Sequence, residues 1–521
     1  MQNGDTIGVT LKATGFPDKK GTELHLDLVA GEERKIDFDP GLNGVLRVEL
    51  VPDDPSLAKP LEMIMGRLPK PRATGAKGRF GIHARISPQI LAYGRAIGLT
   101  WERIHDCSQI TKMGYANPKP GVYHWADAQV DALRAYGFSI LGMPDYPPAW
   151  LYQEKWVEDA GAKKRAEAKE TEIKITDQAD FTVDPDEAEI LSDAEGRRQE
   201  ADRKLRSHKE VVYDKAAFRT FCRELAAHFK GRIDHFEMWN EPYWEYFFKG
   251  SGNHFMEVFH EGAKGIREGN PDAKVLGYCN EFNCANLYAD LAKKVPVEEK
   301  VDYNSMHYYY TGVPGTGEFG IERIVASYPK AFGKHVGSEL WNTEGNMPGG
   351  SSFHSSRYNR DDCEMHTAFG ARVWSETFFG GVDRIFIFGM FNTDGERNGH
   401  FLNTIDYDRS LNGWGAATAT TAYFIDAMEP HREIRSPKGA KLRIFTGGGR
   451  TSAVLFDDCL ERGRPLFDAA KLPAGWEARD GMGNDLRKEG RAPLSPVPFF
   501  ISAEGVAPAA LAEAIGAAIG Q

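Results

Sequence analysis

The chain has 521 residues, a formal net charge of -11 at pH 7, and 41% hydrophobic and 27% charged residues, the proportions of an ordinary globular protein. At this length we expect one large domain with smaller companions. Lys and Arg form no concentrated basic face, which excludes nucleic acid as a partner and disfavours an anionic polymer for the same reason.

The cysteines and the N-terminal residues bear on where the protein works. Six cysteines are scattered along the chain, which indicates buried thiols and not a disulfide framework. The first residues lack the basic and apolar regions of a signal peptide, and no run of about 18 apolar residues occurs. We therefore expect a soluble protein without membrane association, cytoplasmic as the sequence stands, or secreted or periplasmic if a signal has been removed.

Residues 1–75 are predicted to form a β-rich accessory segment. Alternating apolar runs, such as 24–28 and 45–50, are separated by Gly, Pro and Asp turns, which favours a small antiparallel sandwich. Residues 68–75 contain two prolines and a glycine and indicate a linker.

From Phe80 onward, β-type runs alternate with helical stretches, the signature of βα units around a parallel sheet. Helices are expected at about 88–97 and from near Trp125. Eight such runs lie within residues 76–425, which predicts an α/β fold of the (β/α)8 TIM-barrel type. The predicted strands are 80–83, 101–106, 138–143, 235–241, 273–278, 303–309, 336–346 and 382–388.

A charged insertion separates the third and fourth predicted strands. Residues 151–210 are rich in Glu, Lys, Asp and Ala, which indicates a helical excursion on the side of the barrel where βα loops lie. It is either a solvated surface hairpin or a lid or dimer arm beside the active-site face. The length of the loop does not separate these alternatives.

Residues 426–521 return to a β pattern and are predicted to form a second accessory domain. Runs 441–446 and 451–456 flank three glycines and predict a hairpin, because the glycines lack the strand-to-helix context of a phosphate loop. Residues 498–501 favour a last strand, and the Ala-rich stretch 507–519 favours a helix. Together with the N-terminal segment, these strands are expected to supply β-sandwich accessory elements to the barrel, packed as one sandwich.

Two carboxylates stand where predicted barrel strands end. Glu241 is followed by Pro242, which cannot donate to a strand ladder, so the strand stops there and a loop begins. Glu344 ends the seventh predicted strand in the same way. Glycosidic bond cleavage needs one carboxyl group to protonate the leaving oxygen and one carboxylate to stabilise or trap the anomeric carbon.

These motifs resemble the retaining glycoside hydrolases of clan A, whose (β/α)8 barrels carry catalytic glutamates on strands four and seven. The resemblance rests on Trp239-Asn240-Glu241-Pro242 and Trp341-Asn342-Thr343-Glu344-Gly345, with further support at 121–125 and 307–309, and it covers about residues 80–425. It implies that Glu241 is the acid/base, that Glu344 is the nucleophile, and that Asn240 binds the sugar 2-hydroxyl. It also implies that Arg103 and Tyr309 hold the nucleophile ionised and oriented.

Within the clan the sequence is most similar to family 39, the β-xylosidase and iduronidase group, and it departs from the clan pattern in two places. The eighth strand lacks the Trp that many members stack on the sugar, so either Phe388 or Phe391 replaces it or the stacking platform lies elsewhere. The seventh strand also offers Glu339 as a rival nucleophile. We prefer Glu344, because it lies nearer the end of the strand and is followed by glycine.

We add His83, Trp150 and His307 to the expected substrate-binding residues, although a histidine such as His83 is more often structural. The sequence thus predicts a retaining glycoside hydrolase that cleaves a β-linked oligo- or polysaccharide or glycoside by double displacement, with no metal and no organic cofactor. A carbohydrate-binding pseudoenzyme and a transglycosylase remain as alternatives. The sequence does not decide whether the protein forms a homo-oligomer.

Overall fold

The structure is a computed structural model of the chain and describes most of residues 5–151 and 214–520. Within these ranges the segments outside the description are 17, 85, 106–107, 244–246, 249–251, 282–287, 311–319, 347–359, 390–403, 406–409, 435, 437–439 and 458–464. The predicted insertion at 151–210 lies outside the described residues, apart from Leu151. The same is true of Phe391, the alternative to Phe388.

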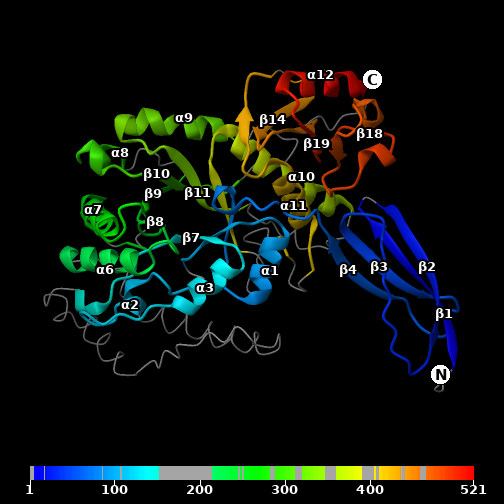
Figure 1. Cartoon of the computed structure of the whole chain (residues 1–521), viewed down its shortest axis with the longest axis horizontal. Coiled ribbons are helices and arrows are strands. Elements are labelled where there is room, and N and C mark those ends of the chain that lie inside the picture. Colours follow the sequence, from blue (N-terminus) through cyan, green and yellow to red (C-terminus); the bar gives the residue numbers. More distant parts are fainter. Residues whose placement is uncertain are drawn as a thin grey trace.

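A closed barrel of parallel strands forms the centre of the molecule (Figure 1). Its strands follow one another in chain order, and β12 closes the ring on β5 with Phe388 opposite His83. All eight predicted strands are present, and the predicted TIM barrel is confirmed. The strands are β5 (Phe80–His83), β6 (Trp101–Arg103), β7 (Ser139–Gly142), β8 (His235–Glu237), β9 (Lys274–Glu281), β10 (Tyr303–His307), β11 (Glu339–Gly345) and β12 (Arg384–Phe388).

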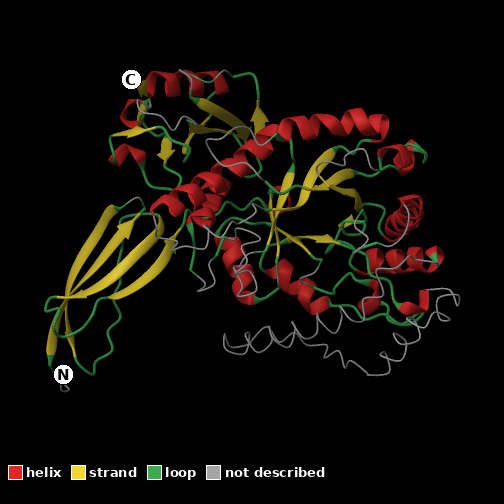
Figure 2. Cartoon of the chain, turned by 180° about the vertical axis from the view of Figure 1, so that it is seen from behind, coloured by secondary structure: helices red, strands yellow, loops and turns green. Residues whose placement is uncertain are grey.

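Helices surround the barrel, as Figure 2 shows from behind. In α6 the side chains of Phe218, Phe221, Cys222 and Leu225 recur at helical spacing and are all buried, while Asp214 caps the first turn through the Ala217 amide. The expected helix at 88–97 is α1. The helices are α1 (Pro88–Ala96), α2 (Met113–Ala116), α3 (Asp127–Ala135), α6 (Lys215–His228), α7 (Gly252–Gly269), α8 (Ala289–Ala292), α9 (Ile321–Phe332), α10 (Arg360–Gly380) and α11 (Gly413–Ile425).

The N-terminal segment forms one antiparallel sheet that extends away from the barrel, drawn in blue in Figure 1. The order of its strands is β2-β1-β3-β4. The stretch 68–75 that follows is anchored on the barrel, because Arg72 donates a hydrogen bond to the Tyr423 carbonyl and lies 4.4 Å from the centre of its ring. The strands are β1 (Thr6–Gly15), β2 (Lys19–Val29), β3 (Gly44–Pro52) and β4 (Leu61–Arg67).

The C-terminal segment forms a five-stranded and a three-stranded antiparallel sheet with its own buried core. The predicted hairpin is present, and its two-residue turn places Gly448 and Gly449 at φ 57° and 77°, a conformation that glycine adopts without steric cost. The elements are β13 (Glu429–His431), β14 (Lys441–Gly447), β15 (Arg450–Phe456), β16 (Leu466–Asp468), β17 (Glu477–Arg479), β18 (Arg491–Pro493), β19 (Phe499–Glu504), α12 (Pro508–Ala518) and β20 (Ile519–Gly520).

The N-terminal and C-terminal sheets remain separate sheets, and residues at the end of a strand and in loops join them. Lys19 pairs with Asp480 at 2.6 Å, and the Asn43 amide donates to Asn484 Oδ1 at 2.7 Å. Both accessory units also pack against α11, the N-terminal one through β3 and the C-terminal one through β19. None of the helices in the described ranges combines the length and the apolarity that a bilayer crossing requires.

Candidate active site

Polar side chains converge at the carboxyl-terminal ends of the barrel strands. His83, Arg103 and His307 are the last residues of β5, β6 and β10, and Glu344 is the next-to-last residue of β11. Asn240 and Glu241 follow β8 after a short irregular stretch. This end of a parallel barrel is where active sites are built, because the βα loops that surround it are free to vary.

The chain leaves β8 in a way that brings two consecutive side chains into the barrel mouth. Neighbouring residues of a regular strand point to opposite faces. Here Trp239 has φ 72° and Glu241 has φ 39°, in the left-handed region that L-residues rarely adopt. Trp239 packs outward against Phe218 and Phe248, and the broken alternation lets both Asn240 and Glu241 contact the inward-facing groups described next.

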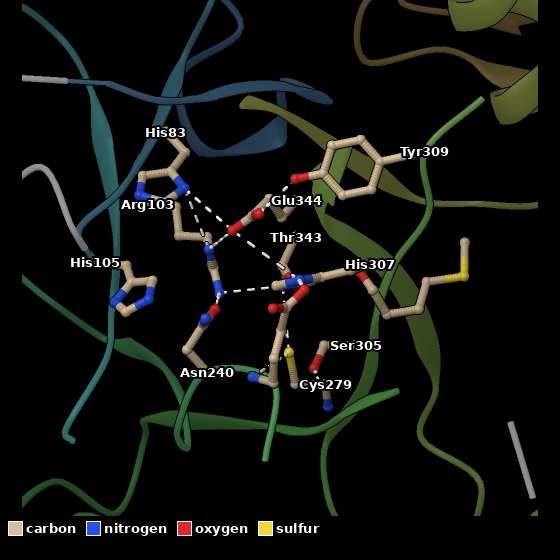
Figure 3. A network of polar contacts seen from close by, with 12 residues as sticks. His83, Arg103, His105, Asn240, Cys279, Ser305, His307, Tyr309, Thr343 and Glu344 are labelled. Carbon is tan, nitrogen blue, oxygen red and sulfur yellow. Dashed lines mark hydrogen bonds and ion pairs between the residues drawn. The ribbon is translucent and has the colours of Figure 1, made fainter. Parts of the chain in front are cut away.

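Arg103 is fully buried and joins most of these groups (Figure 3). A guanidinium has five N–H donors and no acceptor, so each partner must offer a lone pair. Such partners are Glu237 Oε2 at 2.8 Å from Nε, Glu344 Oε2 at 2.8 Å from Nη1 and Asn240 Oδ1 at 2.8 Å from Nη2. The ring nitrogens His83 Nδ1 and His307 Nε2 lie 3.3 Å from Nη1 and 3.2 Å from Nη2. One side chain therefore positions residues from four strands.

Glu344 is 7% exposed and is held as a carboxylate. Burial by itself would raise its pKa, but His307, His83 and Arg103 outweigh burial and lower the pKa well below its usual value. The Tyr309 hydroxyl donates a hydrogen bond of 2.5 Å to the other carboxylate oxygen. Because burial and the nearby Glu344 raise the pKa of Tyr309 well above its usual value, this phenol keeps its proton and remains a donor.

The side chain of Glu241 contacts His307. The Nδ1 atom of His307 lies 2.7 Å from Glu241 Oε1, the Tyr243 hydroxyl donates to the same oxygen at 3.1 Å, and His307 Nε2 lies 3.2 Å from Cys279 Sγ. Burial opposes the charged imidazolium, but Cys279, Glu344 and Glu241 together raise the pKa of His307 well above its usual value. A cationic His307 thus lies between the two glutamates, 4.0 Å from Glu344 Oε2.

The two glutamates lie close enough to act on one bond. An oxygen of Glu241, an oxygen of Glu344 and a His307 ring nitrogen all lie within 4.8 Å of one another. Carboxyl groups about 5 Å apart are typical of glycosidases that form a covalent intermediate, whereas those that activate a water directly keep them about 6.5–9.5 Å apart. The side chains of Glu241 and Glu344 are 15% and 9% exposed, so neither is sealed from the barrel mouth.

Comparison with solved structures identifies the fold. A family 39 glycoside hydrolase from the gut symbiont Bacteroides cellulosilyticus WH2 matches with a TM-score of 0.64 at 14% identity, over 96% of this chain and 95% of that one. The chain has the fold of a family 39 glycoside hydrolase. The GH39 enzyme from Xanthomonas axonopodis pv. citri matches with a TM-score of 0.51 at 13% identity, over 84% and 98% of the two chains. No family sequence model and no curated protein sequence matches.

Within this family 39 fold, two of the expected substrate-binding aromatic residues lie at different distances from the glutamates. Phe388, the last residue of β12, packs edge-on against the His83 ring with centroids 5.1 Å apart, and so lies beside the network. Trp150 belongs to the short 3-10 helix η2 (Ala149–Leu151), and its indole donates to the Asn117 carbonyl. In the described part of the chain, no hydrogen bond joins Trp150 to the Arg103 network.

The rival glutamate of the seventh strand lies at the opposite end of the barrel. Glu339 is the first residue of β11, pairs with Arg384 at 2.5 Å and accepts a hydrogen bond from the Trp341 indole at 2.7 Å. Glu344 lies five positions further along the extended strand, which places the two glutamates near opposite ends of it. The geometry therefore favours Glu344 over Glu339 as the residue that can meet Glu241.

Three residues of the network were missed in the sequence. Glu237 pairs with Arg103, the Thr343 hydroxyl donates to Glu237 at 2.6 Å, and Cys279 accepts from the Glu241 amide at 3.3 Å. The sequence carried a signal for Glu237. It lies two positions after His235 on the same strand, so both side chains share one face. A charged side chain that faces the inside of the barrel needs a partner there. Nothing comparable marks Cys279, whose position depends on its own positive φ of 52°.

The described residues also contain two overlapping sets of metal-ligand type groups. These are Glu237, Cys279 and His307, and the set of Glu241, His307 and Glu344. Arg103 ion-pairs with a carboxylate of each set at 2.8 Å. Because a permanent cation already compensates these carboxylates, a second cation would meet strong repulsion at either position. The chemistry of the site thus favours acid–base and nucleophilic roles for these residues.

Proposed function

We propose that the protein is a retaining glycoside hydrolase that cleaves a neutral β-linked saccharide by double displacement. The observation that carries the proposal is the approach of the Glu241 and Glu344 carboxylates to within 4.8 Å. The fold shared with family 39 glycoside hydrolases supports the same reaction class. β-Xylosidase-like or other β-glycosidase activity is the form of the reaction that we propose.

In the first step, Glu344 attacks the anomeric carbon while the bond to the leaving oxygen breaks, and Glu241 gives that oxygen its proton. This step requires an ionised Glu344. Arg103 and His307 lower the pKa of Glu344, so that the nucleophile is ionised before the reaction starts. The Tyr309 hydrogen bond orients the second oxygen of that carboxylate.

In the second step, Glu241 takes a proton from water, the water oxygen attacks the anomeric carbon, and the Glu344 ester bond breaks. Negative charge thus leaves Glu344 and arises on Glu241 as the intermediate forms, and returns as it decays. His307 lies 2.7 Å from Glu241 and 4.0 Å from Glu344, so its cation faces whichever glutamate carries the charge. We therefore assign His307 to positioning and charge balance, because both its ring nitrogens face protein atoms.

We assign the substrate contacts to residues that surround the two glutamates. Arg103 engages Asn240 through Oδ1, which turns the Nδ2 amide into the donor that can bind the sugar 2-hydroxyl. Phe388 is the aromatic platform that we propose at the end of β12, and His83 lies beside it. Trp150 stays a prediction for a more distant part of the substrate.

The stereochemistry of turnover tests the proposal. A panel of aryl β-glycosides and β-linked polymers should contain a substrate, and proton NMR should show the β-anomer of the sugar as the first product, because two inversions restore the configuration. First appearance of the α-anomer would contradict double displacement. Binding of a saccharide without turnover of any substrate would favour the carbohydrate-binding pseudoenzyme instead.

The acid/base role of Glu241 can be tested separately. In Glu241→Ala, an aryl glycoside with a good leaving group should still form the intermediate, since little protonation is needed. Azide should then restore turnover and yield a β-glycosyl azide, because no base is required to activate it. A variant that is inactive with every leaving group and is not rescued by azide would remove Glu241 from that role.

A further inference from the structure

Among the described residues, the carboxylates of Glu237 and Glu344 both contact Arg103, and of these two only Glu344 is placed to react. Glu237 and Glu344 each lie 2.8 Å from the guanidinium, at Nε and at Nη1. Glu344 retains some exposure to the barrel mouth, whereas Glu237 and Arg103 are both fully buried. The Thr343 hydroxyl covers the second oxygen of Glu237 at 2.6 Å, so this carboxylate has protein partners on both oxygens.

The proposed reaction changes the charge of one partner and not the other. When Glu344 forms an ester with the sugar, its negative charge is lost and Arg103 stays protonated, because its pKa is raised by Glu237 and Glu344 against the opposing effect of burial. A buried guanidinium with no counter-ion is very unfavourable. The intermediate therefore needs another anion in contact with Arg103, and Glu237, 2.8 Å from Nε, is a carboxylate in that position.

We propose that Glu237 is a positioning residue that acts as the permanent counter-ion of Arg103 and keeps the guanidinium neutralised while Glu344 is esterified. This inference rests on the proposed double displacement. Glu237 touches neither substrate nor the reacting atoms and acts only through Arg103. Glu237 also accepts a hydrogen bond from the Thr343 hydroxyl, and Thr343 is the residue before the nucleophile. This bond fixes the position of the counter-ion relative to Glu344.

Loss of the Glu237 charge has opposite consequences for the two steps. With Glu237→Gln, Arg103 loses the charge of one carboxylate partner and depends more on Glu344, so the ionised nucleophile becomes more stable and its esterification slower. The ester is then destabilised relative to the carboxylate, so the intermediate breaks down at an unchanged or higher rate. A purely structural role for Glu237 would instead slow both steps together, since it would misplace Arg103 and Glu344 in each.

The test compares Glu237→Gln, which keeps the shape and loses the charge, with Glu237→Asp, which keeps the charge and shortens the side chain. For Glu237→Gln, kcat/KM on an aryl glycoside should fall about tenfold to a hundredfold, the equivalent of one to two pKa units of charge interaction. Release of a 2-fluoroglycosyl group from the enzyme should not slow. The acidic limb of the kcat/KM profile should move about one pH unit lower, because the pKa of Glu344 falls.

In Glu237→Asp the negative charge is kept, so formation and breakdown of the ester should differ less in their response than they do in Glu237→Gln. Equal slowing of both steps by Glu237→Gln, or an acidic limb that moves to higher pH, would overturn the counter-ion role and leave the glycosidase proposal standing. If the wild-type protein forms no glycosyl adduct at all, the proposed function fails and this inference fails with it. The wild-type result thus separates the two failures.

A stability measurement covers the case in which Glu237→Gln does not fold. Glu344→Gln carries a neutral group at the nucleophile position, as the intermediate does, and Glu237 should suffice to compensate Arg103 in it. Its melting temperature should therefore stay close to the wild-type value, and a double Glu237→Gln, Glu344→Gln variant should lose more stability than the two single variants together. A large loss in Glu344→Gln alone would overturn the proposal.

Discussion

Arg103 shows how a single side chain can order a site made from distant parts of the chain. Its five donors reach residues that follow or end β5, β8, β10 and β11, and it is fully buried. Such a group is stable only if its partners compensate its charge. The same contacts that stabilise the barrel mouth therefore keep Glu344 ionised, which links the packing of the site to its chemistry.

The pH dependence of activity tests the role of His307. His307 is the nearby charge that most lowers the pKa of Glu344, so the neutral variant His307→Gln should raise that pKa. The nucleophile loses its charge as the pH falls through its pKa, and the acidic limb of kcat/KM should therefore move about one pH unit or more to higher pH. An unchanged limb would contradict the electrostatic role.

At the scale of the element, β11 carries a glutamate near each end, and only one faces the site. Glu344→Gln should lower kcat/KM at least about a thousandfold, as expected when the nucleophile is removed. Glu339→Gln is the matched control, because it makes the same chemical change at the other end of the same strand. Its partner Arg384 is partly exposed, so we expect kcat/KM within about threefold of wild type and a small stability loss. A comparable loss of activity in both variants would contradict this arrangement.

The strands and their order along the chain could be predicted from the sequence, because each strand is a short apolar run bounded by turn residues. Such a run can be recognised without knowing what it contacts in the fold. Glu241 and Glu344 were visible for a related reason, since each stands where such a run ends. The ends of β6 and β8 were predicted up to four residues too late, at Asp106 and Glu241 in place of Arg103 and Glu237. At β8 the polar residues that follow have positive φ values, which no local pattern reveals.

The partners within the site were less predictable than its members. Glu237 and Arg103 come from strands 134 positions apart, and their pairing depends on the register of the closed barrel. Cys279 reaches His307 through an irregular backbone in β9. Long-range contacts of this kind follow from the tertiary fold, so the sequence could indicate which residues are polar and inward-facing but not which of them meet.

At the scale of the whole molecule, buried histidines make stability depend on pH. Burial lowers the pKa of His235, His260 and His366 from 6.5 to about 4. The unfolded chain therefore binds more protons than the folded one as the pH falls from 6.5 to about 4, and stability decreases over that window. Buried carboxyls act in the opposite sense, because burial raises the pKa of Asp383 from 3.8 to about 6 and also raises the pKa values of Asp426 and Glu489, but only Asp383 is shifted as far as the three histidines.

We thus expect the melting temperature to fall steadily between about pH 7 and about pH 4.5. In His366→Gln the slope should be shallower than in wild type, because one titrating group is gone. A melting temperature that does not change over this range, or that rises, would contradict the account.

The proposal that this barrel runs a double displacement on Glu344 is tested most directly by trapping the intermediate. A 2-fluoro β-glycoside with a good leaving group slows breakdown of the ester more than its formation, so intact mass spectrometry should show one added glycosyl group. Peptide mapping should place that group on Glu344, and Glu339→Gln should be labelled equally well. A label on another residue, or none with a sugar that the enzyme turns over, would contradict the central claim.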